Sequence, residues 1–460
     1  MKISKYFVLL LITMINCEDN HLVFKFMTNI NLNDVNDENY MRIKYDQKIY
    51  VELEIGHPPQ KIPMTLKTLQ FPTFIVSSEV KDNIKVKFDP KKSDTFKNES
   101  STPITETHRY DFAKSYFSKD ILNINPSLKN FSFYLATEMP VTTKNISGEI
   151  GLSKYSPIVV QHYKESEFLQ QLLDNKLINK KIFGIIYDTE YEGRLIFGAY
   201  MHEIDKNYEE KYMKEFELDS SKVYHINKEM WLMPFELNCL DGKNNSIIYN
   251  ENTFGFLYYE YGLMIGSYNF QINFVKNYFL NKKCENETVD ASSHFTEYYC
   301  KNESQFEDFP NITFVVKAKY GVYNFSFTKD DLFVKRGNKY IFQIVFDIFA
   351  EQGPEYWNIG QTFFRKYAIF LKQEEKENKL AYYTYHKTGS EPDNDNDNTK
   401  MIIIIVLSVV LGLIIIGIIL YFIYLYPKTR KKRAQELDDN YEYKSKEEPK
   451  EKLVADDKEE

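Results

Sequence analysis

The sequence predicts a mostly β ectodomain of two similar lobes, followed by one C-terminal transmembrane helix. From Lys48 onward, short β-branched and aromatic runs are interrupted by Asn, Asp, Gly and Pro at intervals of about 8–15 residues, which favours an all-β architecture. A weak internal repeat of short apolar-Gly elements, GEIGL at 148–152 and WNIG at 357–360, indicates two related lobes. One segment near the C-terminus is long and apolar enough to span a membrane.

The N-terminus has the features of a secretory signal peptide. Lys2 and Lys5 precede an apolar stretch, residues 6–15, that is too short to cross a bilayer, and polar residues follow it. We therefore predict a signal peptide over residues 1–17. Residues 18–39 are polar and acidic without clear periodicity, and we expect a leader over residues 18–47.

The apolar segment 401–426 is predicted to be a transmembrane helix. It contains no charged residue, and at about 1.5 Å per residue it is long enough to cross a hydrocarbon core of about 30 Å with some tilt. Basic residues follow directly, which places the C-terminus in the cytosol. We predict a single-pass type I protein with a stalk at 389–400 and a cytoplasmic tail at 427–460. A buried core helix is the less favoured interpretation.

Sequons and cysteines agree with a lumenal or extracellular ectodomain, in the secretory pathway, the endolysosome or at the cell surface. Cys284 and Cys300 are close enough in sequence to close one small loop by a disulfide, and Cys239 is expected to be a buried thiol. Asn-rich chains also produce sequons by chance, so a sequon alone does not establish that its asparagine is glycosylated. The N-glycosylation candidates are Asn98, Asn130, Asn145, Asn244, Asn286, Asn302, Asn311 and Asn324.

Composition excludes some function classes. The net charge of −8 is modest, and nothing indicates a nucleic-acid partner. Isolated histidines such as His57, His108 and His225 lack the spacing of metal ligands, so we expect no metal and no other cofactor. The abundant Tyr, Phe and Asn can reflect coding bias and carry no functional weight.

Residues 55–78, IGHPPQKIPMTLKTLQFPTFIVSS, read as a hairpin. A strand ends at Ile55, the two prolines make a turn because each fixes φ and lacks an N–H, and MTLKTL begins a second strand. This resembles the first hairpin of the pepsin family of aspartic peptidases, in which IGTPPQ leads seven residues later to the catalytic Asp of D-T-G-S. Here the seventh residue after Gln60 is Lys67, followed by Thr68 and Leu69.

Further motifs extend the resemblance over roughly residues 48–385. FDPKKSDTFKN at Phe88–Asn98 is similar to the family's F-x-P-x-x-S-S-T-F/Y, and residues 148–152 resemble D-G-I-L-G-L. FPNITF at 309–314 matches x-P-x-I-x-F, and WNIGQTFFRKY at 357–367 is similar to W-x-L-G-D-x-F-L-R-x-Y, with Gln361 in place of its Asp. The resemblance implies a bilobal pepsin-like double-ψ β-barrel, with an N-terminal lobe at 48–205 and a C-terminal lobe at 206–388.

Two helices interrupt the predicted strands. Residues 165–177, ESEFLQQLLDNKL, and residues 270–280 each carry apolar side chains in helical spacing. The first of these, together with GRLIFG at Gly193–Gly198, resembles the helix and strand that close the first lobe in the pepsin family.

The resemblance also implies that both catalytic positions have lost their acids. Aligning GFLYYEYGLMIGS with the family's A-I-V-D-S/T-G-T-S-L-I puts Tyr258 at the second catalytic position and Glu260 at the glycine of that motif, although Tyr259 is another candidate for the catalytic position. No D-T-G or D-S-G string occurs in the chain. Tyr110 falls where the tyrosine of the active-site flap belongs, and Phe74 where a tryptophan packs behind it.

These substitutions argue against peptide hydrolysis. The family's reaction needs two carboxylates that share one proton. Lys67 is a donor unless it is strongly desolvated, and the Tyr258 phenol, with a reference pKa of about 10, is a poor base. Leu69 and Glu260 also replace glycines that permit tight loops. Two environments for Glu260 remain open: an ion pair with Lys67, or a solvated position on a remodelled loop.

We therefore expect a membrane-tethered, catalytically inactive family homologue. It would bind an extended peptide or protein segment in the inter-lobe cleft, near Thr68 and Glu260 and between aromatic walls that include Phe74 and Tyr110. One alternative is an active aspartic endopeptidase of the secretory or endolysosomal system that uses unrecognised acids, although the acidic leader argues mildly against it. Another is a structural or recognition glycoprotein with a filled cleft. We expect a monomer.

Overall fold

The computed structural model describes residues 21–28, 40–68, 72–81, 84–105, 114–124, 128–139, 146–153, 165–218, 231–242, 245–289, 294–347, 355–374 and 378–384. The chain divides into two compact units, Met1–His386 and Lys387–Glu460, and every described residue belongs to the first. The predicted signal peptide, stalk, apolar segment 401–426 and tail therefore lie outside the described residues. Within the described ranges, no helix has the length and apolar character needed to cross a membrane.

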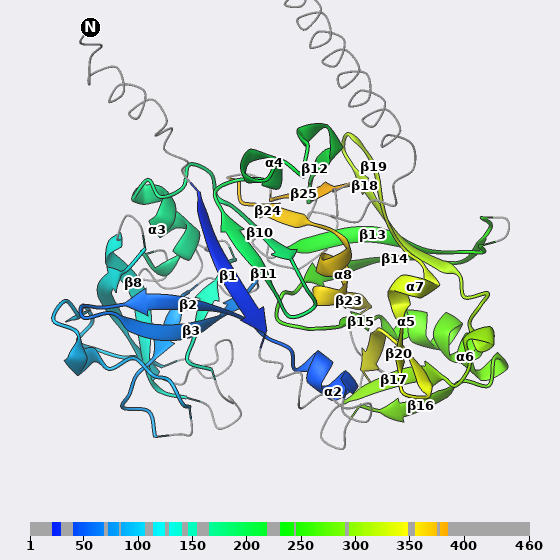
Figure 1. The fold of residues 1–460 in the computed structure, drawn as a ribbon, viewed down its shortest axis with the longest axis horizontal. Coiled ribbons are helices and arrows are strands. Elements are labelled where there is room, and N and C mark those ends of the chain that lie inside the picture. The colour runs from blue at the N-terminus through cyan, green and yellow to red at the C-terminus, as the bar shows by residue number, and fades with distance from the viewer. Residues whose placement is uncertain are drawn as a thin grey trace, which may run out of the picture. The chain divides into compact units, whose positions relative to one another are not determined.

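Strands dominate the described residues and form two sheets (Figure 1). The first sheet contains, in spatial order, β12 (Met213–Glu217), β25 (Lys379–Tyr383), β24 (Ile369–Lys372), β10 (Ile182–Tyr187), β11 (Glu192–Phe197), β1 (Leu22–Thr28), β2 (Ile49–Ile55), β3 (Gln60–Lys67), β9 (Gly148–Gly151), β4 (Phe74–Val76), β8 (Leu128–Glu138), β7 (Lys114–Leu122) and β5 (Lys97–Asn98), with β6 (Ile104–Thr105) beside β7.

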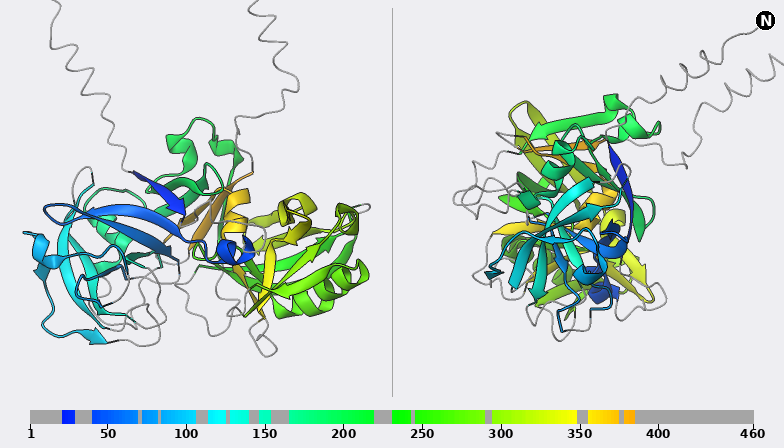
Figure 2. Two further views of the ribbon diagram at one scale, coloured as in Figure 1. Left: turned by 60° about the horizontal axis from the view of Figure 1, so that its bottom comes forward. Right: turned by 90° about the vertical axis from the view of Figure 1, so that its left-hand side faces the viewer.

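The second sheet contains, in spatial order, β19 (Gly321–Phe327), β18 (Asn311–Ala318), β13 (Leu232–Leu240), β14 (Ile247–Leu257), β23 (Tyr356–Ile359), β15 (Met264–Gly266), β22 (Ile344–Asp347), β17 (Phe295–Cys300), β21 (Lys339–Phe342) and β20 (Phe333–Arg336), with β16 (Glu285–Thr288) beside β17. Figure 2 shows the blue and cyan strands of the first sheet and the green and yellow strands of the second gathered in separate parts of this unit. The predicted mostly β, two-lobed architecture is confirmed.

Both lobes use the same strand topology at their centre. In the first lobe the β2–β3 hairpin continues into a parallel pair, β3–β9, then an antiparallel pair, β9–β4, and a parallel pair, β4–β8. In the second lobe the β13–β14 hairpin continues in the same way through β23, β15 and β22. The internal repeat that the sequence indicates therefore exists as a repeated topology.

The first hairpin forms where the sequence predicts it. Residues 56–59 make the turn between β2 and β3, and Gly56 has a φ of +90°. A Cβ at this position would also lie 2.7 Å from the Ser93 Oγ. Glycine is therefore required here both by its backbone conformation and by the lack of space.

The helices are short and agree with the two predicted stretches. α3 (Phe168–Asp174) lies within residues 165–177 and buries its apolar stripe. Residues 268–281 form α5 (Tyr268–Phe270), a π-helical turn (Gln271–Val275) and α6 (Lys276–Asn281), and the Ser267 Oγ caps α5 by accepting from the Phe270 N–H at 3.1 Å. The other α-helices within the described residues are α2 (Tyr40–Tyr45), α4 (Met201–Ile204), α7 (Lys329–Leu332) and α8 (Gln361–Lys366).

One expectation about the N-terminal segment is wrong: residues 22–28, within the stretch 18–39 that we expected to lack periodicity, form a strand. The leader at 18–47 stays a prediction. Leu22–Thr28 form β1, which lies between β11 and β2, and Phe26 is buried opposite Val51. α2 buries three of its side chains, including that of Lys44. The alternation in LVFKFMT is a genuine strand pattern, but it is short and an acidic stretch follows it, so the pattern is weak within the segment as a whole.

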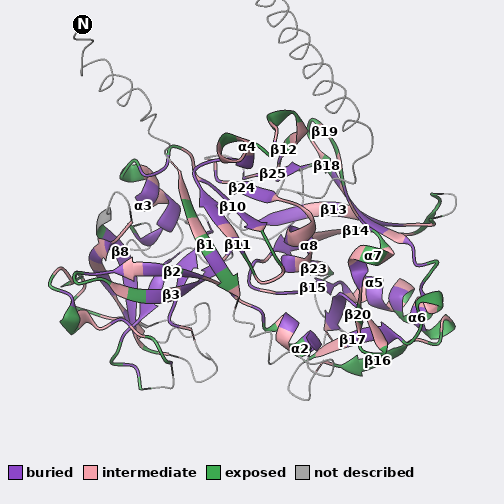
Figure 3. Cartoon of the chain, viewed as in Figure 1, coloured by how far each residue is buried: buried purple, intermediate pink, exposed green. Residues whose placement is uncertain are grey.

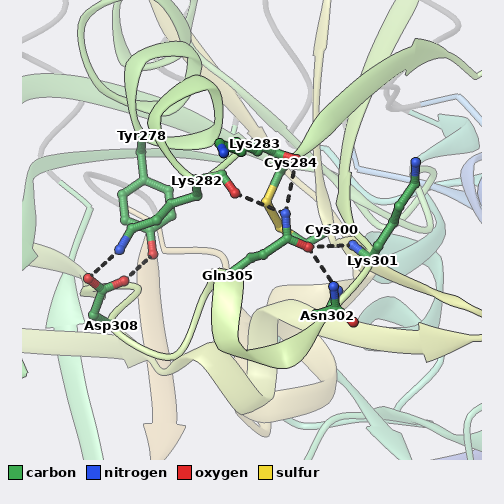
Figure 4. Close-up of a disulfide and its surroundings, with 9 residues drawn as sticks. All are labelled: Tyr278, Lys282, Lys283, Cys284, Cys300, Lys301, Asn302, Gln305 and Asp308. Carbon is green, nitrogen blue, oxygen red and sulfur yellow. Dashed lines mark hydrogen bonds and ion pairs between the residues drawn. A yellow bond between two sulfur atoms is a disulfide. The ribbon is translucent and has the colours of Figure 1, made fainter.

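Buried side chains lie along the inner strands of both sheets (Figure 3). The predicted Cys284–Cys300 disulfide is present, and Cys239 is a buried free thiol. Figure 4 shows Gln305 beside the disulfide: its Nε2 donates to the Lys282 and Lys283 carbonyls, and its Oε1 accepts from the backbone N–H groups of Lys301 and Asn302, all at 2.9 Å. These bonds hold the two ends of the disulfide loop together.

Candidate functional site

Lys67 and Tyr258 occupy matching places in the two lobes. Lys67 ends β3 and pairs with Gly151 in the parallel β3–β9 ladder. In the β14–β23 ladder Leu257 pairs with Ile359, and the next N–H, that of Tyr258, donates to the Ile359 carbonyl at 2.9 Å. Tyr258 therefore lies beside Gly360 in the second lobe, just as Lys67 lies beside Gly151 in the first.

The correspondence continues seven residues farther along the chain in both lobes. There Phe74 pairs with Glu149, and Ile265 pairs with Asn358, each in an antiparallel ladder. Glu149 and Asn358 both stand two residues before the glycine of their motif. Since both ladders give the same register, the match between the lobes does not depend on sequence similarity alone.

The side chain of Lys67 forms an ion pair with a buried carboxylate. Its Nζ lies 3.5 Å from the Glu149 Oε1, and the side-chain exposures are 24% for Lys67 and 0% for Glu149. Thr65 pairs with Glu149 across the ladder, so residues 65, 67 and 149 lie on one face of the sheet. A buried carboxylate is stable only with a partner, and Lys67 supplies one.

Glu260 joins the second lobe to the first. Its Oε1 accepts from the Thr68 backbone N–H at 2.8 Å, and its Oε2 accepts from the Thr68 Oγ1 at 2.9 Å. Both residues are buried. Burial raises the pKa of the Glu260 carboxyl, and the nearby Lys67 charge opposes that shift.

This arrangement decides between the two expected environments of Glu260. A solvated glutamate is wrong, because only 6% of the residue is exposed. Lys67 acts on Glu260 electrostatically, while both carboxylate oxygens accept hydrogen bonds from Thr68. Such hydrogen bonds offset the cost of removing the carboxylate from water. No pattern in the sequence identifies Thr68 as the donor, because the contact joins two lobes.

Lys48 completes a group of charged residues at this place. Its Nζ donates to the Glu260 carbonyl at 3.3 Å and lies 5.8 Å from the centre of the Tyr261 ring. Burial lowers the pKa of Lys48, the Lys67 charge lowers it further, and Glu260 raises it. We call Lys48, Lys67, Glu149 and Glu260 the central charge cluster.

Tyr258 lies in an aromatic environment. Its ring centroid is 5.1 Å from that of Tyr261 and 5.9 Å from that of Phe256, both in edge-on geometry. Burial, and then the Glu260 charge, raise the pKa of the Tyr258 phenol. The phenol therefore stays protonated at acidic and neutral pH.

Tyr259, the other candidate for the second position, faces the core. It is 1% exposed, and its ring lies 4.2 Å from that of Phe364. Tyr258 is half-buried. Of the two tyrosines, only Tyr258 therefore retains appreciable exposed surface.

Gln361 fixes the loop that carries these tyrosines. Its Nε2 donates to the Tyr259 carbonyl at 2.9 Å, and its backbone N–H donates to the Tyr261 carbonyl at 2.7 Å. The preceding Gly360 has no room for a side chain, because a Cβ would lie 1.9 Å from the Leu263 carbonyl oxygen. The amide of Gln361 therefore serves as a structural clamp for this loop.

Phe74 does not form the exposed aromatic wall that we expected. It is 0% exposed and lies in a cluster with Val76, Phe117 and Tyr134. It is the first residue of β4, which pairs with β9 on one side and β8 on the other, so its ring is enclosed. Tyr110 lies outside the described residues.

Six sequon asparagines fall in the described ranges. Asn98, Asn130, Asn286, Asn302 and Asn324 are exposed, and Asn311 is half-buried. Asn145 and Asn244 lie outside the described residues. In the part of the chain that the structure describes, His, Cys, Asp and Glu side chains form no group of three or more that could hold a metal ion.

Comparison with protein families gives one result. The family model of eukaryotic aspartyl proteases matches residues 48–383, which cover most of both lobes and the whole central charge cluster. No curated protein matches the chain.

Proposed function

The chain belongs to the eukaryotic aspartyl protease family, and from this premise we propose that it is a membrane-anchored member that does not hydrolyse peptides. We further propose that it binds an extended peptide or protein segment between its lobes. The observation that carries the proposal is the pair Lys67 and Tyr258, an ammonium and a phenol at matching places in the two lobes.

By resemblance, these two residues hold the catalytic positions of the family. Hydrolysis there requires one carboxylate that takes a proton from water and a second that donates a proton to the forming oxyanion. Lys67 is committed as a cation to Glu149, and the pKa of Tyr258 is raised above its ordinary value. A placed acid or base typically contributes 10²–10⁴-fold to such a reaction, so the loss of both is severe.

Two features of the centre support binding instead of catalysis. The Thr68–Glu260 bonds tie the lobes together, and the Gln361 clamp fixes the second-lobe loop. Lys67 and Tyr258 both keep some exposed surface, so a bound segment can contact them. An extended peptide at this place would pair through its main chain and would meet a cation and a phenol.

Peptide retention tests the binding proposal. Purified full-length protein is incubated with a diverse peptide library at pH 3–7, and retained peptides are identified by mass spectrometry. We expect retention without cleavage, and weaker retention by Lys67→Met than by wild type. Lys317→Met is the matched control, because Lys317 lies on β18 with a 64% exposed side chain. Equal retention by both variants, or no retention at all, contradicts the proposal and leaves a recognition glycoprotein with a filled cleft.

Membrane anchoring rests on the apolar segment 401–426 and the basic residues after it. The expected result is that the full chain stays with membranes after alkaline carbonate extraction and that a chain ending at residue 388 is released. Glycosidase treatment should lower the apparent mass, because five described sequon asparagines are exposed. Release of the full chain by carbonate contradicts the anchor.

A further inference from the structure

A cavity of about 340 Å³ lies outside the central charge cluster. Its lining residues include members of α2, α7, α8, the end of β20 and the turn between β10 and β11, and Figure 1 shows where these elements lie in the fold. Its volume falls in the range of small-molecule sites, ~300–1,000 Å³. Its lining residues are Tyr40, Lys44, Glu190, Phe327, Asp331, Val334, Arg336, Gln343, Thr362, Arg365 and Lys366.

The charges around this cavity are unbalanced. Four cationic side chains line it, against the carboxylates of Glu190 and Asp331. Glu190 pairs with Lys44, and Asp331 pairs with Lys366. Within the described residues, no ion pair joins Arg336 or Arg365 to a carboxylate, so two positive charges remain unneutralised.

The two guanidinium groups also carry unused donors. The Nε atoms of Arg336 and Arg365 are buried and have no hydrogen-bond partner among the described residues. Buried donors without a protein partner are rare, and each calls for an explanation such as strain, a functional role or an ordered water or ion. Lys44, at the end of α2, also lines the cavity, but it is 2% exposed and pairs with Glu190, and burial followed by the Arg365 charge lowers its pKa to about 7.

Neighbouring groups hold both guanidinium groups in place. The Arg336 guanidinium lies 4.3 Å from the centre of the Tyr40 ring, and that of Arg365 lies 5.0 Å from the Tyr187 ring. The Arg365 Nη2 also donates to the Gln47 Oε1 at 2.8 Å. A ligand would therefore meet donors whose positions are already set, which lowers the entropic cost of binding.

We propose that this cavity binds the phosphate group of a phosphorylated small molecule. The planar fork of a guanidinium group can bind the oxygens of a phosphate or of a carboxylate through two hydrogen bonds, so geometry alone does not choose between these ligands. A phosphate monoester carries a charge of about −1.5 to −2 near pH 7, which matches the two unneutralised cations, whereas one carboxylate carries only one negative charge. Tyr40, Phe327 and Val334 provide apolar surface for the organic part.

Calorimetry on the full-length protein tests this site, with inorganic phosphate and glycerol 2-phosphate as probes and acetate as the carboxylate probe, all at one ionic strength. We expect both phosphates to bind and acetate to bind much more weakly. Arg336→Gln and Arg365→Gln should each weaken phosphate binding roughly tenfold or more, because each removes a charge-assisted hydrogen bond. Lys335→Gln, which removes the same charge from an exposed neighbour, should leave binding unchanged.

A variant that is expected to bind phosphate more tightly separates a direct effect on the site from a loss of binding caused by misfolding. Asp331→Asn keeps the size of the side chain and removes a negative charge from the lining, so it should tighten phosphate binding several-fold. The proposal is overturned if phosphate does not bind, or if acetate binds as tightly as phosphate. It is also overturned if Lys335→Gln weakens phosphate binding as much as the two arginine variants do.

Discussion

The two lobes share a backbone plan and differ in the chemistry at its centre. In the first lobe β3 ends at a lysine that is paired with a buried glutamate, and in the second lobe β14 leads into a cluster of aromatic rings around Tyr258. Parallel and antiparallel pairings set the shared frame, while single side chains set the chemistry. The comparison teaches that two lobes can keep one strand topology while matching positions carry different side-chain chemistry.

The first lobe should be far more sensitive than the second to loss of its central group. Lys67→Met leaves the Glu149 carboxylate buried without its cation, and breaking such a pair costs about 3–5 kcal/mol, with the lower end expected because Lys67 is partly exposed. Tyr258→Phe keeps the ring packing and should cost less than about 1 kcal/mol. Denaturant unfolding of the two variants measures the difference.

A second-site change sharpens that test. Adding Glu149→Gln to Lys67→Met removes the isolated charge and should recover most of the lost stability. If the double variant is no more stable than Lys67→Met alone, the ion pair is not what stabilises the first lobe.

The next largest loss of stability should come from breaking the contact between the lobes. Thr68→Val removes one of the two donors to the buried Glu260 carboxylate, and the expected loss is about 1–3 kcal/mol. Thr65→Val is the matched control, since the Thr65 hydroxyl donates to the Gly148 carbonyl at 3.3 Å and involves no charged group. Thermal unfolding should rank Thr68→Val below Thr65→Val, and the reverse order would contradict the inter-lobe role of Thr68.

Three carboxyl groups of the second lobe should make the stability of the folded protein depend on pH. Burial raises the pKa of Glu251, Glu260 and Glu297, all of which lie in this lobe. A carboxyl with a raised folded-state pKa binds its proton more tightly in the folded chain, so its contribution is complete below about pH 4.5 and is lost as the pH rises through the raised value.

Stability curves between pH 4 and 8 check this dependence. These three carboxyls should each contribute less stability as the pH rises, by on the order of 1.4 kcal/mol for every tenfold difference in the proton affinity of one carboxyl between the folded and unfolded chain. Glu297→Gln should flatten the curve, because Glu297 is buried and lies near the Glu287 charge. Identical curves for the variant and the wild type would show that Glu297 does not contribute.

The smallest effect is expected from restoring acids at both centres. Lys67→Asp combined with Tyr258→Asp should still not give full peptidase activity, because Leu69 and Glu260 stand, by resemblance, where the family has glycines, and we expect side chains there to disfavour the family's tight central loops. The measurement is the rate of cleavage of a fluorogenic peptide at pH 3–7. Efficient hydrolysis by the double variant would show that the loops need no glycine.

Local signals predicted much of the fold. The two prolines after His57 place the first hairpin, the stripe in residues 165–177 places α3, and the short spacing of Cys284 and Cys300 predicts their disulfide. The match between Lys67 and Tyr258 follows from sequence motifs, and the register of the strand ladders gives the same match.

Long-range contacts could not be predicted in the same way. The partner of Lys67 is Glu149, and that of Thr68 is Glu260, and both contacts depend on strand register or on the approach of two lobes. The cavity near Arg336 likewise collects residues from elements far apart in the chain. Such contacts leave no periodic pattern in the sequence. The one hint in the sequence was Glu149 itself, because a glutamate within the apolar GEIGL string needs a partner when it is buried.

The most direct test is whether peptide bonds are cleaved. Full-length protein is incubated with a peptide library at pH 3–7, and new peptide termini are counted by mass spectrometry with and without pepstatin. We predict no termini above those found with Lys67→Met. Pepstatin-sensitive cleavage by the wild type that disappears in Glu149→Gln and Glu260→Gln would contradict the central claim, because two buried glutamates would then supply the acids that Lys67 and Tyr258 lack.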